Sequence, residues 1–376
     1  MTVASLGPNQ VAAPTPPAKV DVMLHDGPLL AVPASFVGLH LNRWPSGDPT
    51  SRPPSFAYGT VRSLNYDPAG PGGVSWYDVN PAPGVYDWAR LDQWVATHHA
   101  NGKQLIYTLY GTPQWASSRP GTLDPYNNPG GDSKPVKLAD VAAFVSALVA
   151  RYNGDGTRRI RYLETWNEPD VNGLPYWRDS AADLAALART VYQAAKAADP
   201  GIIVLGPAWV DFNADRTPIN KVWQFMEASD GAGGQGKQWM DAFAWHHYDY
   251  GFDIREMVSQ VTWLKQLLGN VGRGQLPIFL TEVGGWQWND AWPSAQDKAR
   301  QIQRWMMVAA ATGMQTIGLY MHESMAHLGD PSSHPEIAAA IQEVGRLLAG
   351  QSIARAALLE DRRIWVAFAN GTTLVR

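Results

Sequence analysis

The chain has 376 residues, of which 45% are hydrophobic, and a formal net charge of −4. This length allows one large domain or two average ones with a sizeable core. The absence of cysteine excludes disulfides and thiolate catalysis, the lack of a basic patch argues against nucleic-acid binding, and no apolar run is long enough to form a membrane span.

The chain begins with a segment, 1–19, that is rich in Ala and Pro and has no hydrophobic stretch. It is not a signal peptide. We expect a disordered leader or the remainder of a trimmed targeting segment. Two short apolar runs follow, 20–23 and 29–32, and the His-Asp-Gly turn between them predicts an N-terminal hairpin.

Short apolar runs and helical patterns then alternate along most of the chain. The runs, which predict strands, are 36–41, 59–64, 104–109, 160–165, 202–205, 242–246, 278–281 and 316–320. Apolar residues spaced at i, i+3, i+4 and i+7 predict helices, and these are expected at 91–100, 138–152, 181–198, 254–268 and 295–312. Such alternation predicts a parallel sheet covered by helices.

Eight strand–helix units that close on themselves form a (β/α)8 TIM barrel of the α/β class, for which ~250 residues is typical. An open doubly wound sheet would carry a Gly-rich turn after its first strand, but residues 38–44 read GLHLNRW. The runs 364–368 and 372–375 flank Asn-Gly, a type I′ hairpin signal. We therefore expect a catalytic barrel with its N-terminal hairpin at 20–350 and a C-terminal β hairpin at 351–376, the two hairpins forming a small accessory β patch.

Polar residues gather where the predicted strands end, which is where a barrel of this kind carries its reactive groups. Glu168 follows the fourth strand within Trp-Asn-Glu-Pro, and Glu282 ends the seventh. Two carboxylates from two strand ends are the minimum apparatus for cleaving a glycosidic bond. Arg62, in the second strand, would keep Glu282 ionised.

Further residues at the strand ends are candidates for substrate binding. His246 and Tyr248 are two apart and share one face of a strand, so either would donate to a carboxylate at the next strand end. Asn167 presents an amide that suits a substrate hydroxyl, and His40 contacts either the ligand or only other protein groups. The other candidates are Tyr110, Trp115, Trp286 and Tyr320.

Several of these residue types also have structural interpretations. Glu164 lies inside the fourth strand, and we interpret it as a buried partner for a cation. His246-His247 suggests a metal, but adjacent strand residues face opposite ways and no third ligand has useful spacing, so we predict no metal and no other cofactor. Six tryptophans in loops are candidates for stacking against sugar rings: Trp115, Trp166, Trp177, Trp286, Trp288 and Trp292. At least half of them should anchor loops instead.

The motifs at 166–169 and 281–282 resemble the acid/base and nucleophile motifs of clan A retaining glycoside hydrolases, and Arg62 and His246-x-Tyr248 match that clan as well. The resemblance implies that Glu168 is the acid/base, that Glu282 is the nucleophile, and that configuration is retained.

A narrower resemblance is to glycoside hydrolase family 39, which includes β-xylosidases, α-iduronidases and endoglycosidases that trim bacterial exopolysaccharides. It rests on VR at 61–62, WYDV at 76–79, PGVYDW at 83–88 and GTPQWA at 111–116. Two features depart from these relatives. Residues 318–322 read GLYMH where many clan members place a Trp, and the short β tail contrasts with the β-sandwich of the family's xylosidases.

We therefore predict a retaining hydrolase that cleaves β-glycosidic bonds in a polysaccharide, with endo action on a bacterial exopolysaccharide favoured by long loops after strands two, three and seven. An exo-acting β-xylosidase is the first alternative. A non-catalytic carbohydrate-binding barrel is an alternative of another class, which the presence of both glutamates argues against. A polymeric substrate implies a secreted or periplasmic enzyme, and the sequence makes no prediction of oligomeric state.

Overall fold

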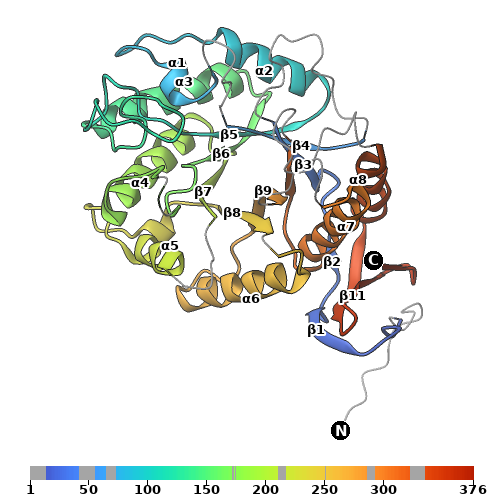
Figure 1. Ribbon diagram of the computed structural model, residues 1–376. Coiled ribbons are helices and arrows are strands. Elements are labelled where there is room, and N and C mark those ends of the chain that lie inside the picture. The colour runs from blue at the N-terminus through green and yellow to red at the C-terminus, as the bar shows by residue number, and fades with distance from the viewer. Residues whose placement is uncertain are drawn as a thin grey trace, which may run out of the picture.

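A computed structural model describes residues 14–41, 56–64, 73–171, 173, 175–210, 217–249, 251–285, 293–321 and 335–376. Its central feature is a closed barrel of eight strands with helices around the outside (Figure 1). The strands follow chain order, β3 to β10, and β10 closes the barrel by pairing with β3. All neighbouring strands are parallel. The predicted (β/α)8 barrel is therefore confirmed.

The barrel strands are β3 (Val37–Leu41), β4 (Thr60–Ser63), β5 (Gln104–Thr108), β6 (Ile160–Glu164), β7 (Ile203–Trp209), β8 (Ala242–Asp249), β9 (Ile278–Gly285) and β10 (Ile317–Met321). The helices are α1 (Trp76–Val79), α2 (Ala89–Ala100), α3 (Leu138–Asn153), α4 (Ala181–Ala198), α5 (Thr217–Glu227), α6 (Ile254–Asn270), α7 (Ala295–Ala311) and α8 (Pro335–Leu348), with a 3₁₀ turn η1 (Gly236–Gln238). The five predicted helices correspond to α2, α3, α4, α6 and α7. Within the described ranges, no helix has the length and apolar character needed to cross a bilayer.

Local sequence explains how the helices around the fourth strand begin and pack. The Ser180 hydroxyl accepts a hydrogen bond from the Asp183 backbone N–H, and the Asp183 carboxylate accepts from the Ser180 N–H, a capping box that starts α4. The face of α3 that carries Val141, Phe144 and Leu148 is buried in the main core between the barrel and its helices. These helices therefore fix β6, the strand that leads to Glu168.

A separate apolar cluster fills the barrel interior nearer the N-terminal ends of the strands. Its members are Ile106, Tyr162, Leu205, Ala208, Ala242, Ala244 and Phe279. Side chains two residues further along a strand point to the same face, so His246 and Tyr248 of β8 continue the inward-facing row of Ala242 and Ala244. Because this apolar cluster fills the other end, the polar groups occupy the C-terminal end of the barrel.

A five-stranded antiparallel sheet lies outside the barrel beside α7 and α8 (Figure 1). Its strands are β1 (Val20–His25), β2 (Leu30–Ala31), β11 (Ser352–Leu359), β12 (Ile364–Phe368) and β13 (Thr373–Val375). The predicted accessory patch is present, but the N-terminal hairpin is wrong. Both β1 and β2 pair with β11 and not with each other. The Ala-rich sequence of β11 has low strand propensity and was not predicted as a strand.

The C-terminal hairpin, β12 with β13, is confirmed. Its turn differs from the predicted type I′. Of the two turn residues only Gly371 has a positive φ, 83°, and its N–H donates to the Phe368 carbonyl. A type I turn followed by a left-handed glycine fits these contacts.

Candidate active site

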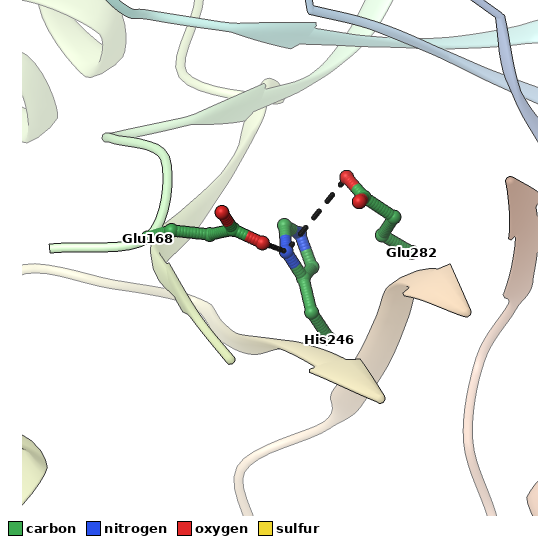
Figure 2. A group of neighbouring side chains, drawn as sticks. All are labelled: Glu168, His246 and Glu282. Atoms are coloured by element: carbon green, nitrogen blue, oxygen red, sulfur yellow. Dashed lines mark hydrogen bonds and ion pairs between the residues drawn. The ribbon is translucent and has the colours of Figure 1, made fainter. Parts of the chain in front are cut away.

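Glu168 and Glu282 meet at the C-terminal rim of the barrel. Their side chains point toward one another, and His246 lies between them (Figure 2). One oxygen of each carboxylate lies within 4.8 Å of the other. Only 8% of Glu168 and 5% of Glu282 is exposed, so both carboxylates act in surroundings where water screens charge poorly.

An irregularity in β9 turns Glu282 toward the barrel axis. Trp245 of β8 pairs with Leu280, but the next residue, His246, pairs with Glu282. Thr281 is therefore an extra residue, and such a bulge reverses which face the following side chains occupy. Phe279 and Glu282 consequently both point inward although they are three residues apart.

Glu168 has a backbone conformation that non-glycine residues rarely adopt. Its φ is +44°, in the left-handed region, and its N–H donates to the Ala208 carbonyl at 2.8 Å. Strained backbone of this kind costs about 1–3 kcal/mol and is concentrated at functional sites. The contact with β7 holds the strained residue in place and directs its carboxyl group into the opening at the C-terminal rim of the barrel, called the mouth below.

Arg62 connects the groups of the site. It is 1% exposed, and its Nη1 donates to Glu282 Oε2 at 2.9 Å and lies 2.9 Å from His40 Nδ1. Its Nε donates to Glu164 Oε1 at 2.9 Å and its Nη2 to Asn167 Oδ1 at 2.8 Å. One guanidinium thus holds residues from three other strand ends in a fixed arrangement.

Glu164 was predicted as a buried partner for a cation, and that prediction is confirmed, with Arg62 as the cation. Glu164 is fully buried and also accepts a hydrogen bond from the Thr108 hydroxyl at 3.0 Å. The Arg62 contact also orients the amide of Asn167, because the amide oxygen is already an acceptor. Its NH₂ group remains a hydrogen-bond donor, and binding of a substrate hydroxyl by Asn167 stays a prediction.

The electrostatics of Glu282 combine opposing effects. Burial raises its pKa to about 7, with the carboxylates of Glu168 and Glu164 adding to the rise and His246 and Arg62 opposing it. Tyr248 also donates a hydrogen bond from its hydroxyl to Glu282 Oε1. Two close carboxylates in a buried site titrate as a unit, and here the hydrogen-bond donors are directed at Glu282.

His246 contacts the other carboxylate. Its Nδ1 lies 2.7 Å from Glu168 Oε1 and 3.8 Å from Glu282 Oε2. Burial lowers the pKa of His246 to about 4, and the charge of Arg62 adds to this effect. The imidazole is therefore neutral at pH 7 and carries one proton, which it can share with Glu168.

His40 and Tyr320 form the wall next to Glu282. His40 is fully buried, lies 3.7 Å from Glu282 Oε2, and contacts the Tyr320 ring at a centroid distance of 4.8 Å. Tyr320 is half-buried, and its ring lies 6.4 Å from that of Tyr248. His40 is thus a hydrogen-bonded support, whereas the two tyrosine rings reach the mouth.

The comparisons with known proteins agree with this geometry. Residues 133–320, half of the 376-residue chain, match the family described as "Glycosyl hydrolase catalytic core". The chain belongs to this family. It is therefore a glycosidase with a carbohydrate substrate. No curated protein sequence matches the chain.

Solved structures share the fold of this glycosidase. A GH39 enzyme from Xanthomonas axonopodis pv. citri has a TM-score of 0.59 at 17% identity over 93% of this chain and 75% of its own. A monomeric β-xylosidase from Caulobacter crescentus CB15 has a TM-score of 0.58 at 17% identity over 93% and 76%. A glucosidase from Croceicoccus marinus has 0.57 at 15% identity over 93% and 78%. At these identities the likeness shows a shared fold.

The aromatic candidates are divided between the mouth of the glycosidase and its loop anchors. Trp115 donates from its indole N–H to the Asn80 carbonyl at 2.8 Å and packs on the core. Trp166 and Trp177 are buried and donate to backbone carbonyls as well. These three tryptophans therefore anchor loops, and a substrate contact of the half-buried Trp115 stays a prediction. Trp286, Trp288 and Trp292 lie outside the described residues.

Tyr110 does not reach the mouth as a free ring. It is 1% exposed, and its hydroxyl donates to Asp124 Oδ2 at 3.2 Å. Its ring instead contacts Tyr126 and Tyr176, with centroids 5.5 and 5.8 Å away. These two half-buried tyrosines were not predicted from the sequence. The sequence feature that could have identified them is a tyrosine directly after a proline, in the loops that follow β5 and β6.

The carboxylate–histidine cluster also bears on the metal prediction. The reason that no third ligand is available is wrong, because Glu168, His246 and Glu282 each place one potential ligand atom within 4.8 Å of the others. These atoms already interact with one another, and the Arg62 guanidinium, 2.9 Å from Glu282, repels a cation there. We interpret the cluster as an acid–base group. His247 faces the other way, toward Gln260 of α6.

Proposed function

We propose that this glycosidase cleaves β-glycosidic bonds with retention of configuration. Glu282 is the nucleophile and Glu168 is the acid/base. The observation that carries this proposal is the short separation of the two carboxylates, with Arg62 and Tyr248 both donating hydrogen bonds to Glu282.

The short separation supports retention. Retaining glycosidases hold their carboxyl groups ~5–5.5 Å apart, whereas inverting enzymes need ~6.5–9.5 Å to admit a water molecule. With oxygens within 4.8 Å of each other, Glu282 can attack the anomeric carbon directly.

The hydrogen bonds support the assignment of roles. Donors stabilise an ionised acceptor, so Arg62 and Tyr248 favour a charged Glu282. Burial and the raised pKa of Glu282 mean that the two carboxylates hold one proton near neutral pH. That proton then resides on Glu168, beside the neutral His246.

The reaction follows in two steps. In the first step, Glu282 attacks the anomeric carbon while Glu168 donates its proton to the glycosidic oxygen. The bond to the leaving group breaks, and a covalent glycosyl–enzyme forms. Glu168, now a carboxylate, removes a proton from water as the water attacks the same carbon. Glu282 leaves, and Glu168 regains its proton.

We further propose endo action on a polysaccharide, with a bacterial exopolysaccharide as the substrate class. The support is the family 39 resemblance and the long segment 109–137 between β5 and α3 beside the mouth. A polymer of this kind is met outside the cytoplasm, so the proposed location is secreted or periplasmic.

A screen of bacterial and plant polysaccharides with product sizing tests this function. We expect oligomeric products, and release of single sugars from the first time points would overturn endo action. The Glu282→Gln variant should lose at least about 10³-fold in kcat. Glu360→Gln, an exposed glutamate paired with Lys19, is the matched control and should retain wild-type activity. Full activity of Glu282→Gln would contradict the assignment.

A further inference from the structure

Two half-buried tyrosines, Tyr126 and Tyr176, form a pair at the mouth that the mechanism above does not use. Tyr126 comes from the segment after β5 and Tyr176 from the segment after β6. Their ring centroids are 5.6 Å apart with the planes at 60°, and their hydroxyl groups are hydrogen-bonded. An edge-to-face pair of this kind is a stable aromatic arrangement.

Hydrogen bonds to residues packed on the core hold the two tyrosines in place. Asp124 Oδ1 accepts the backbone N–H of Tyr126 at 2.8 Å, and its Oδ2 accepts the Tyr110 hydroxyl. The indole N–H of Trp166 donates to the Tyr176 carbonyl at 2.8 Å. Tyr110 and Trp166 are themselves buried, so both loops are fixed on the core and the two phenol groups are preorganised for a ligand.

The pair lies within the electrostatic field of the acid/base. Burial raises the pKa of both tyrosines, and the charge of Glu168 raises each pKa further. Tyr320, on the other wall of the mouth, adds to both pKa shifts. These interactions agree with the position of the two tyrosines in the segments that follow β5 and β6, next to the strand end that carries Glu168.

The position of Glu168 decides which part of the substrate this pair meets. An acid that protonates the glycosidic oxygen lies beside the bond to the leaving group, whereas the nucleophile lies under the other sugar. Groups from the segment that carries Glu168, and from the neighbouring segment after β5, accordingly meet the leaving group. Phenol rings offer an apolar face for a sugar ring and a hydroxyl for its polar edge.

We propose that Tyr126 and Tyr176 bind the leaving-group sugar of the substrate. The inference rests on the proposed function, because it uses Glu168 as the acid/base. Both tyrosines make the enzyme selective for substrates whose leaving group is itself a carbohydrate ring, and the same subsite takes the acceptor sugar when the glycosyl–enzyme is transferred to a saccharide.

The test compares two substrates of the same glycosyl unit. One is an oligosaccharide released from the polysaccharide that the wild type cleaves, and the other is the β-glycosyl fluoride of its glycosyl sugar, whose small leaving group does not fill the subsite. In Tyr126→Ala and Tyr176→Ala, the loss of kcat/KM on the oligosaccharide should exceed that on the fluoride by about 10- to 100-fold. Transfer of the glycosyl unit to an added saccharide acceptor should fall in parallel.

Tyr126→Phe and Tyr176→Phe keep the rings and provide the test if an alanine variant does not fold. The loss of kcat/KM should be smaller in these variants than in the alanine variants, and it should again be larger on the oligosaccharide than on the fluoride. Tyr192→Phe is the matched control, because Tyr192 is a half-buried tyrosine of α4 whose hydroxyl bonds Asp241 at 3.1 Å. Tyr192→Phe should leave kcat/KM unchanged on both substrates. Equal losses on the two substrates, or no loss on either, would overturn the subsite. Failure of the proposed function is distinguished by Glu282→Gln, which would then keep its activity on both.

Discussion

The two halves of the mouth are built from different chemistry. The Glu282 half is polar, and Arg62 and Tyr248 donate hydrogen bonds to the carboxylate. The Glu168 half contains the aromatic pair Tyr126 and Tyr176 and a glutamate in strained backbone. The difference fits the two proposed roles, because a nucleophile must be held ionised while an acid needs a proton and a bound leaving group.

The largest expected contrast comes from removing the acid. In Glu168→Ala, kcat/KM on the polysaccharide should fall by about 10²- to 10⁴-fold because the glycosidic oxygen is no longer protonated. The loss on the β-glycosyl fluoride should be smaller by at least about tenfold, since fluoride leaves without a proton. Steady-state kinetics on the two substrates measure this ratio. Equal losses would mean that Glu168 is not the acid, and Glu360→Ala is the control.

Arg62→Lys tests the polar half. Lysine keeps the charge, but it cannot donate to Glu164, Glu282 and Asn167 in one plane. We expect kcat/KM to fall by about 10- to 100-fold on both substrates alike, because the nucleophile is affected whatever the leaving group. Arg158→Lys, which alters the ion pair between the partly exposed Arg158 and the buried Asp199, should retain activity. A loss restricted to the polysaccharide would place Arg62 with the leaving-group half instead.

The smallest effect concerns stability and pH. Burial raises the pKa of Glu282 from 4.5 to about 7, and because Glu168 and Glu282 titrate as a unit, the folded pair binds its shared proton more tightly than the unfolded chain does. The associated stability is complete below pH ~4.5 and is lost as the pH rises through about 7. Glu282→Gln removes one of the two buried carboxylates and should therefore be more stable than the wild type at pH 8, where the pair is fully ionised, by at most about 3 kcal/mol.

Urea unfolding at pH 4.5 and pH 8 measures this difference. At pH 4.5, where the pair holds its shared proton, the difference in free energy of unfolding between Glu282→Gln and the wild type should be smaller than at pH 8. A stability difference that does not change between the two pH values would show that ionisation of Glu282 carries no cost in the folded state.

The meeting of Glu168 and Glu282 at one rim could be predicted because strand periodicity and strand ends carry the information. Short apolar runs located β6 and β9, and the polar residues that follow them identified Glu168 and Glu282. Pairing of Arg62 with Glu282 followed from opposite charge at the same rim. The bulge at Thr281 has no signature in the sequence, yet it decides that Glu282 faces inward.

Other features depend on tertiary contacts that no local pattern encodes. The Ala-rich β11 is a strand because β1, β2 and β12 pair with it. Trp115 anchors a loop because its indole meets the Asn80 carbonyl. Tyr126 and Tyr176 lie 50 residues apart and meet only because their loops follow neighbouring strands.

The assignment of the two glutamates is tested most directly by chemical rescue with azide. With a β-glycosyl substrate that has a good leaving group, Glu282→Ala in azide should form the α-glycosyl azide, because azide replaces the missing nucleophile and inverts the anomeric carbon. Glu168→Ala should form the β-glycosyl azide, because azide attacks the intact glycosyl–enzyme. Proton NMR of the products distinguishes the two anomers. The opposite pairing of variant and anomer would contradict the account.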